Sequence, residues 1–301
     1  MLQLPSDSLF AIRNSPFAFG GSTIATRRIT NTTAYRYPRE RLILALTLLL
    51  VLVVIAATAT ATVCLSAVFI LVMVLVSYAY TRSHHKALLQ RAQRVAPRSA
   101  PVLAGLVAES AARLQVDDVQ VFVAPVNTLN AYTFGLLAPQ VVVLNAPLLR
   151  VMDADEMRFV VGHELGHVRL GHTWLNSLVG GMAGIPSPFF ASAILAMAFL
   201  WWNRACEYSA DRAGMLACGS PRKAISALIK LAAGPDARTR AGLARALQRI
   251  EAEDDYALSN LGEALSTHPM TVRRIEELRR YTASAEYRRL QPLVDRNVAG
   301  G

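Results

Sequence analysis

The chain has 301 residues, of which 53% are apolar and 17% are charged, and its formal net charge is +10. This length allows one or two domains with a hydrophobic core, and so few charges favour membrane segments over a wholly soluble protein. The basic balance fits anionic lipid as well as nucleic acid. Because the sequence lacks a DNA- or RNA-binding signature, we predict no nucleic-acid partner.

The N-terminal third predicts a tail followed by a membrane anchor. Residues 1–40 are rich in Ser, Thr and Arg, which predicts a basic disordered tail; an organelle transit peptide would have a similar composition. Within residues 41–82, the run from Leu42 to Thr81 has no charge and is about twice as long as one spanning helix needs. We therefore predict a transmembrane hairpin of two helices, near 42–58 and 62–80. Basic residues flank both ends, so both ends are expected to face the cytoplasm.

A helix and three short strands are expected next. Residues 87–115 have the pattern of an amphipathic helix. Runs of β-branched and aromatic residues, separated by Pro, Asn and Gly, predict strands at 119–125, 130–134 and 140–145. After them, Asp153 with Glu156 three residues later has the pattern of a capping box, which predicts the start of another helix.

Helices are also expected through the second half of the chain, where Gly and Pro residues give clear start and stop signals. The predicted helices cover about 203–218, 221–233, 237–252 and 270–282. Residues 284–301 are expected to form a C-terminal tail.

The stretch HELGH, residues 163–167, matches the H-E-x-x-H pattern. On a helix, residues i and i+4 share a face, so His163 and His167 can bind one zinc ion. Glu164 would lie at the rim of that site, where it can take a proton from a zinc-bound water and pass it to a leaving amine. Gly166 predicts the close approach of another backbone, because a mid-helix glycine costs about 1 kcal/mol relative to alanine.

A catalytic zinc ion usually has three protein ligands. Glu207 and Asp211 lie at i and i+4 of a predicted helix, near Gly214 and several alanines that would allow tight packing against the motif. We favour Glu207 as the third ligand over the alternative, His172. Asp211 would orient a ligand histidine through its second ring nitrogen. A solvated acidic face is the other interpretation of the Glu207–Asp211 pair.

Residues 100–282 resemble the HtpX-type membrane zinc metalloproteases, which are related to the CAAX prenyl endopeptidases. The resemblance rests on four stretches: HELGH (163–167), EYSAD (207–211), NAYTFG (130–135) and THPMTVRRIEEL (267–278). It implies an α+β, mainly α-helical gluzincin-type metalloprotease domain with a small β-sheet, here over residues 87–283. The N-terminal transmembrane helical hairpin also fits the family.

The resemblance implies one Zn²⁺ per chain, with three ligands: His163, His167 and Glu207. Glu164 would be the general base and acid, and Asp211 would support a ligand. His268 would stabilise the oxyanion of the tetrahedral intermediate, with Arg274 as a further candidate; a simple turn is the other interpretation of the His268–Pro269 pair. The strand within residues 130–135 would offer its edge to an extended polypeptide substrate.

The chain departs from the family pattern between the motif and Glu207, where two further spans are usual. Arms at about 174–185 and 188–202 would each rise roughly 18–23 Å as helices, which is less than the hydrocarbon thickness of about 30 Å. We expect residues 173–203 to form a shallow apolar hairpin that dips into the bilayer or lies on it. Trp201 and Trp202 would lie at the interface. A buried soluble hairpin is the alternative.

We therefore predict a membrane-anchored zinc endopeptidase in a bacterial inner membrane, with its catalytic domain in the cytoplasm; an organelle membrane is the alternative. The resemblance implies that its substrates are misfolded or unassembled membrane proteins. One other class is a non-catalytic scaffold that keeps zinc for stability, against which Glu164 argues. Another is a specialised protease that processes one lipidated peptide, which would require more membrane spans than this chain has.

Overall fold

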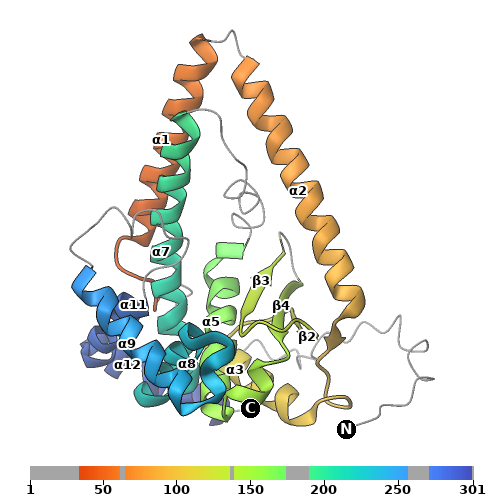
Figure 1. The fold of residues 1–301 in the computed structure, drawn as a ribbon, viewed down its shortest axis with the longest axis vertical. Coiled ribbons are helices and arrows are strands. Elements are labelled where there is room, and N and C mark those ends of the chain that lie inside the picture. The colour runs from red at the N-terminus through yellow and green to blue at the C-terminus, as the bar shows by residue number, and fades with distance from the viewer. Residues whose placement is uncertain (1–33, 62–64, 136–138, 174–189, 257–270, 300–301) are drawn as a thin grey trace.

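A computed structural model describes residues 34–61, 65–135, 139–173, 190–256 and 271–299 (Figure 1). The described chain is mostly helical, with one small mixed sheet. Its elements, in chain order, are α1 (Glu40–Ala61), α2 (Leu65–Arg91), β1 (Gln93–Arg94), α3 (Pro101–Leu114), β2 (Val119–Ala124), β3 (Ala131–Phe134), β4 (Gln140–Asn145), α4 (Leu148–Val151), α5 (Ala154–Leu170), α7 (Phe190–Cys218), α8 (Pro221–Ala233), η2 (Gly234–Arg238), α9 (Arg240–Tyr256), α11 (Thr271–Ala283) and α12 (Ala285–Ala299).

The sheet has the strand order β1-β2-β4-β3. Strands β2 and β4 are parallel, with Val121 opposite Val142, whereas β3 runs antiparallel to β4, with Thr133 opposite Val142. β4 lies inside the sheet and is therefore apolar along most of its length. The three predicted strands are confirmed. β3 is an edge strand and lies beside α5 (Figure 1).

Two sequence predictions about the helices around this sheet are wrong. Residues 87–115 do not form one helix, because α2 ends at Arg91 and β1 pairs antiparallel with β2 before Pro101 starts α3. Proline favours the first turn of a helix, which explains the restart there. Residues 285–299 form α12 instead of a tail, because Leu290 and Val294 lie one turn apart and are both buried.

The segment before α1 also differs from the prediction. Residues 1–33 lie outside the described residues, but residues 34–40 pack against the helices of the main domain instead of belonging to a disordered tail. Tyr35 is buried, and the backbone amide of Tyr37 donates to Ser209 Oγ of α7 at 2.8 Å. Glu40, the first residue of α1, is only 1% exposed.

Helices α1 and α2 carry much of the exposed apolar surface. Leu49 and Leu52 on α1, and Leu71 and Leu75 on α2, each expose more than half of their surface. Among the described residues, one helix, over Glu40–Thr60, is long and apolar enough to cross a bilayer. The second predicted span begins in residues 62–64, outside the described residues, so the hairpin stays a prediction.

Helix α7 overturns one boundary of the predicted apolar hairpin. The arm at 174–185 lies outside the described residues. The predicted second arm does not end near residue 203. Residues 190–203 continue into the helix that carries Glu207, and this helix has a total length of about 43 Å. No glycine or proline lies between Phe190 and Glu207 to interrupt it. The helix runs beside α1 (Figure 1).

Glycines bring α5 and α7 into close contact. A Cβ atom added at Gly162 would lie 2.4 Å from Ala217 Cβ, and one at Gly166 would lie 2.6 Å from Ala213 Cβ. On the other helix, a Cβ at Gly214 would lie 2.7 Å from the Phe159 carbonyl oxygen. The close approach predicted from Gly166 and Gly214 is confirmed. Any larger residue at these positions would separate the two helices.

The ends of α5 follow the sequence signals. The Asp153 carboxylate accepts from the amides of Asp155 and Glu156, and the Glu156 carboxylate accepts from the Asp153 amide at 2.8 Å. The predicted capping box is therefore confirmed. Gly171 ends the helix with a φ of 76°, a left-handed conformation that glycine adopts without strain.

We expect Gly162→Ala to lower the free energy of unfolding by about 1–3 kcal/mol, because the new methyl group must push α7 away. Gly105→Ala on α3 is the matched control, since nothing lies within 4 Å of its added Cβ; it should gain up to about 1 kcal/mol of helix propensity. The midpoint of thermal unfolding of each variant in detergent measures the difference. Equal midpoints for the two variants would contradict close packing at Gly162.

Candidate metal centre

Helices α5 and α7 bring two histidines and a glutamate together. His163 and His167 lie one turn apart on the face of α5 that meets α7, and their Nε2 atoms are 3.2 Å apart. Glu207 of α7 reaches both rings: its carboxylate oxygens lie 3.6 Å from His163 Nε2 and 3.4 Å from His167 Nε2. Among the described residues, these three offer ligand atoms that all lie within 4.8 Å of one another.

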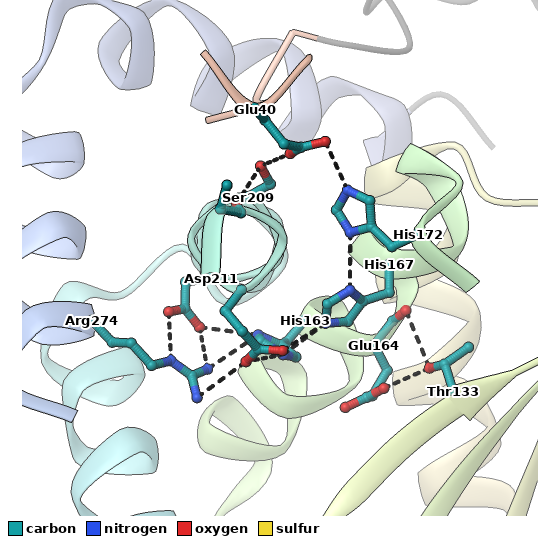
Figure 2. Close-up of polar contacts among 11 residues, drawn as sticks. Glu40, Thr133, His163, Glu164, His167, His172, Ser209, Asp211 and Arg274 are labelled. Atoms are coloured by element: carbon teal, nitrogen blue, oxygen red, sulfur yellow. Dashed lines mark hydrogen bonds and ion pairs between the residues drawn. The ribbon is translucent and has the colours of Figure 1, made fainter. Parts of the chain in front are cut away.

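An ion-pair network of Asp211 and Arg274 contacts His163 and Glu207. Asp211, one turn after Glu207 on α7, places Oδ1 3.0 Å from His163 Nδ1. Arg274 of α11 donates to both Asp211 oxygens, at 2.6 and 2.8 Å, and its guanidinium also lies 3.4 Å from Glu207 (Figure 2). Asp211 therefore faces the second ring nitrogen of His163, although its role in metal binding stays a prediction.

The same network keeps the carboxylates ionised. Burial by itself raises the pKa of the Glu207 carboxyl, but the Arg274 guanidinium and the two histidines hold that pKa well below its ordinary value. Burial also opposes ionisation of Asp211, and Arg274 again outweighs it and lowers the pKa. Glu207 is thus an anion that faces two imidazole nitrogens, which suits the binding of a cation.

Glu164 lies on the same turn of α5 but faces the sheet. Thr133 of β3 donates its hydroxyl to Glu164 Oε2 at 2.5 Å (Figure 2). A cavity of about 280 Å³ opens here, lined by residues of β3, α5, α7 and α11. Tyr132, Thr133, Glu164 and Arg274 are among those that line it. The edge strand and the HELGH glutamate therefore share one cavity.

His172 does not join the three clustered ligand atoms. Its Nδ1 lies 3.0 Å from Nδ1 of His167, the ring nitrogen that faces away from Glu207. Its Nε2 lies 3.1 Å from Glu40 Oε1 (Figure 2). Burial lowers the pKa of His172 to about 4. Glu207 therefore faces the Nε2 atoms of both HELGH histidines and His172 does not, while the choice of Glu207 as third ligand stays a prediction.

Glu40 is the polar group that the sequence prediction missed. It lies 132 positions from His172, at the start of an apolar run, where the sequence predicts the last residue of the tail. The Arg36 guanidinium and the Ser209 hydroxyl also donate to its carboxylate. The sequence shows only that Glu40 is an acidic residue at the edge of a long uncharged segment. That position does not indicate which residues the carboxylate contacts.

The structure describes only one of the two residues predicted to stabilise the oxyanion. His268 lies outside the described residues. Arg274 lines the cavity, but two of its guanidinium nitrogens are bound to Asp211. Its position supports the two carboxylates directly, and a contact with the oxyanion stays a prediction.

Comparison with known proteins gives the family. The sequence pattern described as peptidase family M48 matches residues 97–282, which is more than half of the chain. The chain belongs to this family. It is 29% identical over 204 residues to "Plastoglobule-localized metallopeptidase 48, chloroplastic" of Arabidopsis thaliana, covering 62% of this chain and 59% of that protein. It is 28% identical over 236 residues to "Protease HtpX homolog" of Moorella thermoacetica, covering 66% and 78% respectively.

A second protein named "Protease HtpX homolog", from Persephonella marina, is 26% identical over 238 residues. No solved structure matches the chain. The resemblance to HtpX-type metalloproteases is confirmed by these matches.

This M48 chain has residues that fit the metal that its family implies. Two imidazole nitrogens and a carboxylate are the donors of catalytic zinc sites that leave a fourth position to water. The Nε2 atoms of His163 and His167 are close enough that a shared cation would satisfy both. Each ring has a polar partner at its Nδ1, as zinc-binding histidines usually have.

We expect Arg274→Leu to destabilise the metal-free protein by about 3–5 kcal/mol, because it leaves the buried Asp211 and the partly buried Glu207 without their cation. Added zinc should restore part of this loss through Glu207. Arg280→Leu on the same helix is the control; its side chain is 66% exposed, so the change should be below about 0.5 kcal/mol. Chemical unfolding with and without zinc measures both. Equal losses for the two variants would rule out the buried network.

Proposed function

We propose that the chain is a membrane-anchored zinc endopeptidase with His163, His167 and Glu207 as its metal ligands. The observation that carries the proposal is the convergence of these three side chains beside a cavity that also holds Glu164 and an edge strand. Family M48 membership supports metal-dependent peptide hydrolysis.

Glu164 is the proposed general base and acid. Glu164 as a whole is 6% exposed; it lines the cavity, and its carboxylate accepts a hydrogen bond from Thr133. A zinc ion bound at the neighbouring histidines would polarise the scissile carbonyl and lower the pKa of a water molecule. Glu164 would accept the proton from the attacking water and deliver it to the leaving amine.

The edge strand β3 is the proposed docking element for an extended substrate. Within the described part of the chain, β3 pairs with β4 on one side and has no strand on the other. A substrate strand could add to that outer edge through main-chain hydrogen bonds, which give affinity with little side-chain selection. Because Thr133 of β3 also donates a hydrogen bond to Glu164, a substrate backbone paired with β3 would lie at a fixed position relative to the general base.

Exposed apolar helices support the membrane placement. Hydrocarbon tails would cover the leucines of α1 and α2 that water would otherwise contact. Trp201 of α7 is 46% exposed and suits an interface, whereas Trp202 is buried, so its predicted place at the interface is wrong. Glu207 would lie about 9 Å further along the helix than Trp201. The protease domain would thus lie against the bilayer, with α1 and α2 as the transmembrane hairpin.

We infer that misfolded or unassembled membrane proteins of a bacterial inner membrane are the substrates. A site close to the bilayer can reach extended segments that leave it, and backbone pairing tolerates many sequences. The basic residues at both ends of the proposed hairpin favour a cytoplasmic site; they include Arg36, Arg39, Arg82 and Lys86.

The decisive experiment measures zinc content and casein cleavage by the detergent-purified full chain. We expect Glu164→Gln to keep zinc and to lose at least about 100-fold in activity, because it removes the general base. Glu207→Ala should lose both zinc and activity, because two ligands remain. A wild-type protein that binds zinc but cleaves nothing would favour the scaffold instead.

The topology gives a separate prediction. In a cysteine-free background, Thr60→Cys near the end of α1 should react with a membrane-impermeant thiol reagent from the periplasmic side of whole cells. Ser83→Cys on α2 should react only after the cells are opened, because the basic residues near it stay cytoplasmic. Labelling of both positions, or of neither, in intact cells would contradict the hairpin.

A further inference from the structure

A chain of buried hydrogen-bonding groups joins the first residue of α1 to the metal centre. Glu40, His172 and His167 are 1%, 1% and 9% exposed. Their contacts run from Glu40 Oε1 to His172 Nε2 at 3.1 Å, and from His172 Nδ1 to His167 Nδ1 at 3.0 Å (Figure 2). The three residues come from two segments that are far apart in the sequence.

The order of donors and acceptors in this chain is determined at one end. An ionised carboxylate can only accept, so His172 must donate its Nε2–H to Glu40. A neutral His172 then has a lone pair at Nδ1, which can accept only if His167 carries its proton at Nδ1. In neutral His167, the Nε2 atom then has a lone pair that faces His163 and Glu207.

We propose that Glu40 and His172 are positioning residues that hold His167 in the tautomer able to bind the metal, so that the first membrane helix completes the metal centre. The inference rests on the proposed ligands. His163 has the equivalent support directly, from Asp211. His167 receives it through a second imidazole, which spans the distance to a carboxylate on another helix.

Two side chains besides His172 hold Glu40 in place for this role. The hydroxyl of Ser209 on α7 donates to Oε2, and the Arg36 guanidinium donates to Oε1. Arg36 also donates to the carbonyl of Leu170 at the end of α5, at 2.8 Å. The start of α1 is therefore tied to both helices that carry the metal ligands.

A second metal site is the competing interpretation of the same cluster. Glu40, His172 and Cys206 offer ligand atoms within 4.8 Å of one another, and all three are buried. However, the Glu40 carboxylate already accepts from Arg36 and Ser209. Both Glu40 oxygens therefore already accept hydrogen bonds, Oε1 from Arg36 and His172 and Oε2 from Ser209, so we favour the hydrogen-bonded chain.

The test compares two substitutions of His172 in the full chain. The amide oxygen of His172→Asn can lie near the former Nδ1 and accept from His167, whereas His172→Phe keeps a ring of similar shape without an acceptor. Competition with a chelator should give zinc binding that is about 10–100-fold weaker for His172→Phe, with most of that loss recovered in His172→Asn. Glu40→Gln, which keeps an acceptor, and Glu40→Met form an independent pair with the same expected order.

A second readout needs no metal. The spectra of zinc-free protein labelled with ¹⁵N-histidine are measured at alkaline pH, because burial by itself lowers the pKa of His167 but Glu207 outweighs it and raises that pKa. The NMR shifts of neutral His167 should then report a proton at Nδ1 in the wild type and a mixture of tautomers in His172→Phe. This measurement tests the hydrogen-bonded chain even if the wild type binds no zinc, a result that would overturn the proposed function itself. If His172→Phe does not fold, the Glu40 pair supplies both measurements.

Three results would overturn the inference. One is wild-type zinc affinity in both His172→Phe and Glu40→Met. Another is an equal loss in His172→Asn and His172→Phe, which would mean that His172 acts through packing. The third is binding of two zinc ions per wild-type chain with loss of one in Cys206→Ser, which would make Glu40 and His172 ligands of a second metal.

Discussion

The close contact between α5 and α7 is the constraint on which the centre depends. His163 and His167 come from one helix and Glu207 from the other, so the distance between the helices decides whether the three side chains can meet. Glycine at positions 162, 166 and 214 removes the side chains that would hold the backbones apart. This packing leaves the imidazole nitrogens and the carboxylate oxygens within 3.2–3.6 Å of one another.

This packing takes several carboxylates out of water, and nearby arginine side chains compensate for their negative charge. Arg274 from α11 forms ion pairs with Asp211 and Glu207, while Arg36 contacts Glu40 on the other side of the centre. A buried carboxylate without a partner would be protonated or would destabilise the fold. The arginines thus keep the carboxylates ionised and close to the histidines, and they connect α11 and the start of α1 to α5 and α7.

The proposed membrane helices and the proposed catalytic site form one structure. Helix α1 begins with Glu40 beside His172 and continues as an exposed apolar helix, and α7 runs beside it before it reaches Glu207 (Figure 1). On the other side, β3 contacts α5 through Thr133 and Glu164. In the proposed enzyme, the metal would therefore lie between the anchor and the substrate-binding edge.

Local sequence alone determined the features that depend on local geometry. The spacing of His163 and His167, the capping box at Asp153 and the three strands follow from helix and strand periods and from turn residues. Tertiary structure decided the partners of Glu40, His172 and Arg274, because these contacts join segments that only packing brings together. It also decided the uninterrupted length of α7 and the burial of α12. The sequence pattern predicted a break within α7 and a tail in place of α12. Neither signal ends a helix whose apolar face packs against the rest of the protein.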